Sequence, residues 1–265
     1  MSSLTFLLIL LSGIYVGMFL FIYLYQDKLI FFPPSPNPLH YEQWKQNELY
    51  IPSKKDKLHA WKVTNQKCTN NYSLIYFGGN AEDVSGNLPD AANYNVKNIY
   101  FINLSGYGSS TGKPSESVFY QNGLDVYDYI VNQENTKPDT IILMGRSLGS
   151  AVALYVNANR KVKALLLVTP FDKLSNLVPG LLKYLFPTTL TLKHKFDNLS
   201  YIESIKNKIL ILAASHDEVI PTKSTMTLHK TCDVNAKCTV IDDTNHQTIS
   251  NEIYFEEINE FIAAL

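Results

Sequence analysis

The stretch Thr140-Ile141-Ile142-Leu143-Met144-Gly145-Arg146-Ser147-Leu148-Gly149 decides the fold. Its apolar first half predicts a buried strand, and the apolar residues 151–156 beyond Gly-x-Ser-x-Gly predict a helix. Strand, tight turn and helix are what a nucleophile elbow requires, because small residues two before and two after the serine allow a strained turn that exposes its oxygen at the helix N-terminus. Ser147 is therefore the candidate nucleophile. The alternative is a glycine-bounded turn with an idle serine.

Around this stretch, apolar strand candidates alternate with helical segments. Strands that are apolar on both faces indicate an α/β fold with a mostly parallel central sheet and helices on both faces. Segments 48–51 and 58–63 alternate in polarity and predict an antiparallel edge. The expected parallel strands are 73–77, 98–104, 140–144, 164–168, 208–213 and 237–241, and the expected helices are 82–94, 117–132, 148–159, 222–232 and 249–264.

The insertion at about 170–205 breaks this alternation, because an ordinary crossover needs fewer residues. Its apolar residues exceed what one amphipathic helix buries. We expect a short cap over the C-terminal edge of the sheet, where α/β folds place their ligands. Leu181, Leu185 and Phe186 are the candidate substrate-binding residues. The alternative is an elongated crossover helix, with these side chains packing only on one another.

The first 26 residues form a separate segment. No residue from Leu4 to Tyr25 carries a charge, and a helix of this length, roughly 33 Å, spans a bilayer core. A single-pass transmembrane anchor is favoured over a cleaved signal peptide, because no basic residue precedes the apolar run and no A-x-A site follows it. Gly13 and Gly17 form a Gly-x-x-x-Gly pair, which allows a homodimer through the anchor helix.

A proline-rich connector, residues 27–47, follows the anchor and is expected to space the domain stiffly from the membrane. Phe31 and Phe32 have the alternatives of packing on the domain or dipping into the lipid interface. The remaining residues, 48–265, form the α/β domain that carries Ser147 and the insertion at about 170–205. The side of the membrane stays open, as does the state of Cys232 and Cys238, which either form a disulfide or are reduced thiols.

Size and charge narrow the class of protein. The 265 residues allow one large α/β domain, and a hydrophobic content of 46% supports a sizeable core. The net charge is −1, and the basic residues are scattered without a stripe. Nucleic acid is therefore excluded as an expected partner.

A serine nucleophile needs a base, and the base needs an orienting acid. Asp217 follows the strand candidate 208–213, and His246 follows the strand candidate 237–241. The order serine, acid, histidine on successive loops is the one found on hydrolase-type α/β sheets. Glu218, Asp242 and Asp243 are competing acids, and His216 and His229 are competing bases. We assign the triad as Ser147, Asp217 and His246.

The oxyanion of a tetrahedral intermediate needs two backbone donors. One is the N–H of Leu148, directly after the nucleophile. The other is expected from the glycine-rich loop after the strand 73–77, where glycines let the backbone approach a substrate. The N–H of Asn80 is the first choice, and that of Gly79 is the fallback.

With these residues placed, the chain resembles the membrane-anchored α/β-hydrolase-domain (ABHD-type) serine hydrolases, which are related to prolyl-oligopeptidase-like esterases. The resemblance runs from about Asp27 to the C-terminus. It implies an α/β-hydrolase fold and Ser-Asp-His catalysis of acyl ester or thioester cleavage, often of lipid-linked substrates, without metal or cofactor. Two departures are Gly78-Gly79-Asn80 in place of His-Gly-Asn, and Ala214-Ser215 where the family has glycine. The motifs are Lys28-Leu29-Ile30-Phe31-Phe32-Pro33, Gly78-Gly79-Asn80-Ala81-Glu82, Gly106-Tyr107-Gly108-Ser109-Ser110-Thr111-Gly112, Gly145-Arg146-Ser147-Leu148-Gly149, Phe196-Asp197-Asn198, Asp217-Glu218-Val219-Ile220-Pro221 and Asn245-His246.

The sequence thus predicts a membrane-anchored serine hydrolase that acts on an acyl ester or thioester, with membrane lipid as its other partner. Two alternatives remain. One is a serine peptidase of the prolyl-oligopeptidase-like type, against which the short cap and the lack of a gating domain argue. The other is a non-catalytic membrane scaffold, which has no need of all three triad groups.

Overall fold

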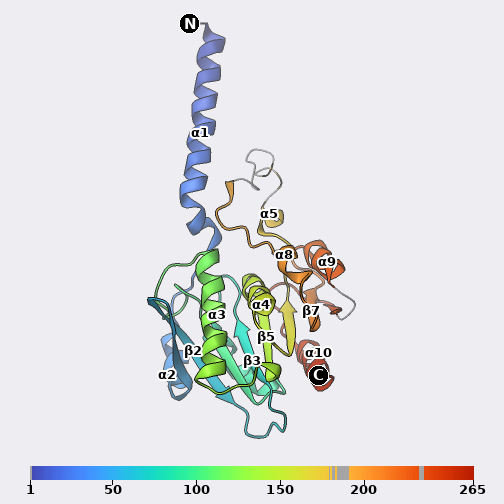
Figure 1. The fold of residues 1–265 in the computed structure, drawn as a ribbon. Coiled ribbons are helices and arrows are strands. Elements are labelled where there is room, and N and C mark those ends of the chain that lie inside the picture. Colours follow the sequence, from blue (N-terminus) through green and yellow to red (C-terminus); the bar gives the residue numbers. More distant parts are fainter. Residues whose placement is uncertain (1, 179, 181–182, 184–190, 233–235) are drawn as a thin grey trace.

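The protein folds around one eight-stranded sheet, from which a long N-terminal helix projects (Figure 1). The computed structural model describes residues 2–178, 180, 183, 191–232 and 236–265. Strand order across the sheet is β1-β2-β4-β3-β5-β6-β7-β8. In the described part of the chain, β2 runs antiparallel to both of its neighbours, and all pairs from β4 to β8 are parallel. The strands are β1 (Glu48–Ser53), β2 (Asp56–Thr64), β3 (Ser73–Phe77), β4 (Asn98–Ile102), β5 (Ile141–Arg146), β6 (Ala164–Val168), β7 (Lys208–Ala214) and β8 (Ala236–Ile241).

Helices cover both faces of this sheet and create two apolar cores. Alternate residues of each central strand enter opposite cores: on β3, Ile75 and Phe77 face one, while Leu74 and Tyr76 face the other. The first core lies under α3, α4, α8 and α9, and the second under α10 and the 3-10 helix η2. These helices are α3 (Glu116–Asn132), α4 (Leu148–Asn159), α8 (Leu199–Ile202), α9 (Thr222–Thr231), α10 (Glu252–Ala263) and η2 (Val84–Asn93), with a further short 3-10 helix η3 (Pro138–Thr140) before β5.

The expected fold class is confirmed, including the parallel sheet, the covering helices and the antiparallel edge. One element differs in type. The segment 82–94, expected as an α-helix, is the 3-10 helix η2. Gly86 and Asn87 are weak helix formers, and Pro89 inside the segment cannot donate the main-chain hydrogen bond that an α-helix needs there.

Helix α1 (Ser3–Ile30) is continuous and apolar, with a mean hydropathy of 2.4 over its most apolar window. Its 28 residues make a rod about 42 Å long, more than the roughly 30 Å of a bilayer core. The helix is therefore long and apolar enough to cross a membrane. In Figure 1 it leaves the domain at the end where α5 (Leu174–Leu177) also lies.

The segment after α1 does not act as the expected spacer. Phe31 is buried, with 4% of its surface exposed, whereas Phe32 is 53% exposed. The main-chain N–H of Asn37 donates to Asp83 over 3.3 Å, which fastens the segment to the loop after β3. A spacer would leave this backbone without contacts to the domain. The alternative stated for Phe31, packing on the domain, therefore describes this segment. Two short helices follow, α2 (Pro38–Gln43) and η1 (Lys45–Asn47).

The described ends of the insertion at 170–205 lie against each other. Lys173 and Asp197 form an isolated antiparallel bridge, and the Lys173 ammonium contacts the Asp197 carboxylate at 2.7 Å. A cap at this position remains a prediction. Leu181, Leu185 and Phe186, the expected substrate-binding residues, lie outside the described residues.

Candidate active site

Ser147 stands at the sharp turn between β5 and α4. Its backbone has a φ of 49° and a ψ of −116°, in the left-handed half of conformational space that residues other than glycine rarely enter. The N–H of Ser147 donates to the carbonyl oxygen of Val168 over 2.9 Å, which holds the turn against the end of β6. A strained backbone that its surroundings hold in place is what a nucleophile elbow requires.

The two glycines of the motif are required by close backbone contacts. A Cβ on Gly149 would lie 2.1 Å from the carbonyl oxygen of Phe77, at the end of β3. A Cβ on Gly145 would lie 2.4 Å from the carbonyl oxygen of Gly149. Side chains at either position would push α4 away from the sheet and displace the serine between them.

Asp217 and His246 lie on the loops that follow β7 and β8. Nδ1 of His246 is 2.8 Å from Oδ2 of Asp217. Oδ1 of Asp217 accepts hydrogen bonds from the N–H groups of Val219 and Ile220, at 2.9 and 2.7 Å. The Asp217 side chain is only 2% exposed. With Nδ1 engaged by the carboxylate, Nε2 is the ring nitrogen left to accept a proton.

The competing groups are placed differently. His216 is exposed, and its Nδ1 contacts the hydroxyl of the adjacent Ser215 at 2.9 Å. Glu218, Asp242 and Asp243 are exposed as well. The N–H of His216 donates to the carbonyl oxygen of Thr244 over 2.9 Å, which joins the acid loop to the histidine loop. Among the described acids, Asp217 is the one that contacts His246.

Arg146, immediately before the nucleophile, links two parts of the site. Its Nη2 donates to the carbonyl oxygen of His246 over 2.7 Å, and its Nη1 lies 3.6 Å from Oε2 of Glu82. Burial lowers the pKa of this guanidinium, but the nearby Tyr76 and Glu82 outweigh burial and raise the pKa above its ordinary value. Arg146 therefore stays charged. Glu82 in turn accepts hydrogen bonds from Tyr76 and Asn87, at 2.7 and 2.6 Å.

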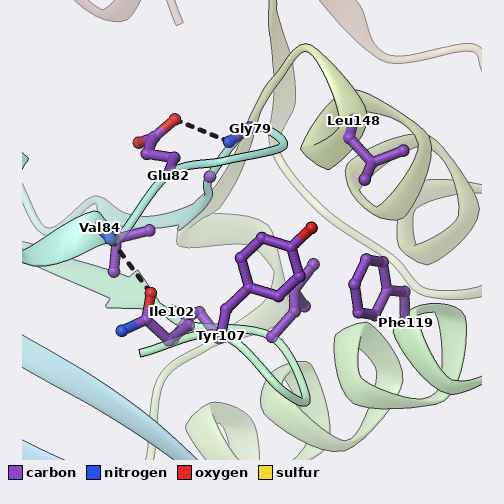
Figure 2. A pocket seen from close by; sticks show the side chains of 10 residues that line it. Gly79, Glu82, Val84, Ile102, Tyr107, Phe119 and Leu148 are labelled. Atoms are coloured by element: carbon purple, nitrogen blue, oxygen red, sulfur yellow. Dashed lines mark hydrogen bonds between the residues drawn. The ribbon is translucent and has the colours of Figure 1, made fainter. Parts of the chain in front are cut away.

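The loop after β3 is held in place from inside. Oε2 of Glu82 accepts a hydrogen bond from the N–H of Gly79 at 2.7 Å (Figure 2). The N–H of Gly79, the fallback oxyanion donor, is thus occupied by a carboxylate. Gly79 itself lies beside the nucleophile, since a Cβ built on it would be 3.5 Å from that of Ser147. The role of Asn80 as the second donor stays a prediction.

A cavity of about 10 Å³ lies between this loop, the start of α4 and the loop after β4. Figure 2 shows the ring of Tyr107 in its middle, with Phe119 beside it and Leu148 above. The rings of Tyr107 and Phe119 meet edge to face, with centroids 5.7 Å apart. Leu148, the first expected oxyanion donor, is thus at the wall of a small apolar hollow.

Sequence reasoning missed the ionic and amide contacts around Ser147, Asp217 and His246. Arg146 and Glu82 both fall within quoted motifs, as the variable residue of Gly-x-Ser-x-Gly and the last residue of the Asn80 loop. A charged residue inside each of two buried motifs is the signal that could have paired them. All three cysteines, among them Cys232 and Cys238, are free thiols. Within the described ranges, no group of three or more His, Cys, Asp or Glu side chains is arranged to hold a metal ion.

The sheet order, the elbow and the acid–histidine pair define the class: the fold is that of the α/β hydrolases. The chain belongs to an uncharacterised protein family (UPF0227), whose model matches residues 109–263, more than half of the sequence. It is similar to protein bem46 of Schizosaccharomyces pombe, at 26% identity over 92% of this chain and 87% of that protein. It is also similar to the alpha/beta hydrolase domain-containing protein WAV2 of Arabidopsis thaliana, at 24% identity over 87% of this chain and 83% of that protein. The alpha/beta hydrolase domain-containing protein 17B of Xenopus laevis is 27% identical over 72% of this chain and 66% of that protein.

Solved structures agree on the fold. The Pyrococcus furiosus esterase Pf2001 superposes with a TM-score of 0.67 at 14% identity, covering 89% of this chain and 99% of the esterase. Est1E from Butyrivibrio proteoclasticus, solved with ferulic acid bound, superposes with a TM-score of 0.65 at 19% identity, covering 82% of this chain and 98% of Est1E. The expected resemblance to α/β-hydrolase-domain proteins is therefore confirmed, and the solved structures share the α/β-hydrolase fold.

Proposed function

We propose that this protein is a membrane-anchored serine hydrolase that cleaves carboxylic esters or thioesters, with an acyl or lipid-linked group as substrate. The observation that carries the proposal is the Asp217–His246 pair, whose carboxylate is buried and whose loop is tied to the residue next to Ser147. Buried carboxylate, oriented imidazole and strained serine turn are the three parts of a hydroxyl nucleophile with its base.

In this mechanism His246 removes the proton of Ser147 while the serine oxygen bonds to the substrate carbonyl carbon. The protonated imidazole then gives its proton to the departing alcohol or thiol, which leaves an acyl-serine. Water, deprotonated by the same imidazole, attacks the acyl-serine and releases the acid. Asp217 holds the imidazole in one tautomer throughout and stabilises its charged form.

Two main-chain donors would stabilise the negative oxygen of the intermediate. Leu148 begins α4, and the first N–H groups of a helix have no partner within it. Asn80 is favoured over Gly79 as the second donor, because the N–H of Gly79 already binds the Glu82 carboxylate. Losing one such donor costs on the order of a hundredfold or more in rate.

The lipid-linked substrate is inferred from where α1 meets the domain. The last turn of α1 contacts the loop after β3, which follows the C-terminal end of a strand next to β5. Ser147, Asp217 and His246 also follow C-terminal ends of parallel strands, so the site and the anchor share one edge of the sheet. A bilayer crossed by α1 would therefore lie on the side of the site. Leu181, Leu185 and Phe186 are proposed to line the acyl pocket.

A fluorophosphonate probe tests the nucleophile, since it forms a covalent bond with activated serines. Wild type is expected to react, and Ser147→Ala is expected to lose the reaction entirely. Ser204→Ala, which removes an exposed hydroxyl elsewhere, is the matched control and should react like wild type. A folded wild type that does not react would favour the scaffold alternative, and labelling that survives Ser147→Ala would refute the assigned nucleophile.

Hydrolysis of p-nitrophenyl esters of graded chain length tests the substrate class. Medium and long acyl chains should be cleaved with higher kcat/KM than acetyl, both in detergent and in vesicles. A preference for acetyl would overturn the lipid-linked part of the proposal and leave an esterase. Cleavage of peptide amides in preference to all these esters would favour the peptidase alternative.

A further inference from the structure

The base of α1 is part of the catalytic domain. The structure describes every residue of α1. Among them only Gln26 is buried, with 3% of its surface exposed. Its Nε2 donates to the carbonyl oxygen of Thr191 at 3.2 Å, and its Oε1 accepts from the N–H of Lys193 at 2.7 Å. One turn of helix is thus bonded to the main chain of the insertion at 170–205.

Neighbouring residues extend this contact. Oδ1 of Asp27 lies 2.9 Å from Nε2 of His194. Phe31, directly after the helix, packs its ring on those of His194, Phe119 and Phe196, with centroids 5.0, 5.3 and 6.2 Å apart. A buried amide, a carboxylate–imidazole contact and an aromatic cluster hold the base of α1 in one position relative to the domain.

Asn80 connects that base to the loop beside the nucleophile. Its side-chain Nδ2 donates to the carbonyl oxygen of Ile30 at 2.7 Å. Its Oδ1 accepts from the N–H of Phe32 at 3.0 Å and from the hydroxyl of Tyr107 at 2.6 Å. Burial raises the pKa of Tyr107, so this hydroxyl stays protonated and able to donate. The side-chain amide of Asn80 is thus hydrogen-bonded to the main chain on both sides of Phe31.

The backbone of the loop after β3 is strained and has to be held in place by contacts with its surroundings. Ala81, the next residue, has a φ of 57°, in the left-handed region that is unfavourable for residues with a Cβ. Only surrounding contacts keep a short loop in that conformation. Two are present: the Glu82 carboxylate on the N–H of Gly79, and the Asn80 side chain on the base of α1.

We infer that the side chain of Asn80 is a positioning group that couples the seating of α1 to the oxyanion site, so that the rate of acyl transfer depends on the anchor being docked. The inference rests on the proposed function, because it concerns the same site. It assigns the Asn80 side chain a role separate from that of its main-chain N–H. The side chain sets where that N–H lies, and the base of α1 sets where the side chain lies.

Asn80→Ala is the direct test, since it keeps the main-chain N–H and removes all three side-chain hydrogen bonds. Expected is a fall in kcat of about 10- to 100-fold with KM changed by less than about twofold, because misplacing an oxyanion donor weakens the transition state and not substrate binding. The rate of fluorophosphonate labelling should fall in parallel. The midpoint of thermal unfolding should fall by a few degrees for each hydrogen bond lost, while the variant stays folded at the assay temperature.

Tyr107→Phe is the second variant. It is nearly isosteric with wild type, so it tests the inference even if Asn80→Ala does not fold. It removes one of the three hydrogen bonds and should lower kcat several-fold at constant KM. Its matched control is Tyr127→Phe, since the Tyr127 hydroxyl is also buried and donates to a carbonyl oxygen, that of Lys161, at 2.5 Å. The control should keep the wild-type kcat.

A double-mutant cycle tests the coupling to the anchor. Gln26→Ala, which removes the two hydrogen bonds between the buried amide and the insertion, should lower kcat several-fold in the wild-type background and have little further effect in Asn80→Ala. Additive effects would show that α1 does not act through Asn80 and would overturn the inference. A folded Asn80→Ala or Tyr107→Phe with wild-type kcat and labelling rate would overturn it too, leaving the proposed function intact. The proposed function fails separately, when wild type does not label or Ser147→Ala still does.

Discussion

Arg146 holds the main chain of His246: its Nη2 donates to the carbonyl oxygen of that residue over 2.7 Å. The same guanidinium lies 3.6 Å from the carboxylate of Glu82, which in turn accepts the N–H of Gly79. A single, mostly buried cation therefore connects the histidine loop with the loop beside Ser147. Because Arg146 precedes Ser147 in the chain, the connection starts at the residue next to the proposed nucleophile.

Arg146→Met should lower kcat about 10- to 100-fold, because the histidine loop loses its support and a small misplacement of the base is costly. It should also lower the free energy of unfolding by up to about 3 kcal/mol, since the mostly buried Glu82 loses its cation. Arg146→Lys keeps the charge and should therefore show smaller losses of kcat and of unfolding free energy than Arg146→Met. Steady-state kinetics and thermal unfolding measure these effects. Arg160→Met is the control, because Arg160 also pairs with a carboxylate, that of Asp128 at 2.8 Å, at a half-exposed position. An equal loss of kcat in this control would contradict the prediction.

Asp217→Asn should lower kcat by about 10⁴ while the protein stays folded, because an amide favours the wrong imidazole tautomer. Fluorophosphonate labelling should slow correspondingly. Glu218→Gln, at the adjacent exposed position, is the control and should match wild type. If Glu218→Gln were the variant with the large loss, the assignment of the acid would be wrong.

Gly149→Ala should destabilise the fold by at least about 2 kcal/mol or prevent folding, since overpacking of a well-filled core has this magnitude. The added Cβ would meet two main-chain oxygens, 2.1 Å from that of Phe77 and 2.5 Å from that of Gly78. The Phe77 oxygen belongs to β3 and cannot move without distorting that strand. Gly86→Ala is the matched control, with nothing within 4 Å of the new Cβ. Unfolding midpoints of the two variants would be compared, and a neutral Gly149→Ala would show that the elbow is looser than described.

Cys232 should alkylate slowly at pH 8 and faster as the pH rises. Burial and the nearby Cys238 raise the pKa of its thiol to about 11. About one thiol in a thousand is then ionised at pH 8, against about one in four for an unperturbed cysteine. Mass spectrometry of the Cys232 peptide after iodoacetamide treatment should show a rate that increases about tenfold per pH unit up to pH 10.

Two outcomes would contradict this prediction. Alkylation at pH 8 as fast as that of free cysteine would show an ordinary pKa. A Cys232 peptide that resists alkylation at every pH until it is reduced would show a disulfide with Cys238, the alternative that the sequence left open.

The sheet was predictable because its strands are local apolar runs with clear ends. Segments 73–77 and 164–168 agree with β3 and β6 residue by residue, and 148–159 agrees with α4. The type of η2 was not predictable from apolar spacing, since α and 3-10 helices place similar residues inward and differ in hydrogen bonding, which Pro89 interrupts.

At the site, Asp217 and His246 could be found by their place after successive strands, and the structure brings them into contact. Their catalytic roles, with those of Ser147, Leu148 and Asn80, stay predictions. The contacts of Arg146 with His246, and of Asn80 with Ile30, join residues far apart in the sequence. These contacts depend on how the loops and the end of α1 pack together in the folded protein, and local patterns in a single sequence do not predict such long-range packing.

Helix α1 has no break between Ser3 and the turn that carries Gln26. If this rod crosses a bilayer, the domain is joined to the membrane without a flexible linker, and the height of the proposed site above the lipid headgroups follows from how the rod lies in the bilayer. Scissile bonds would then be selected by their depth in the membrane as much as by their chemical structure. Lengthening the rod by a full helical turn would lift the whole site by about 5 Å.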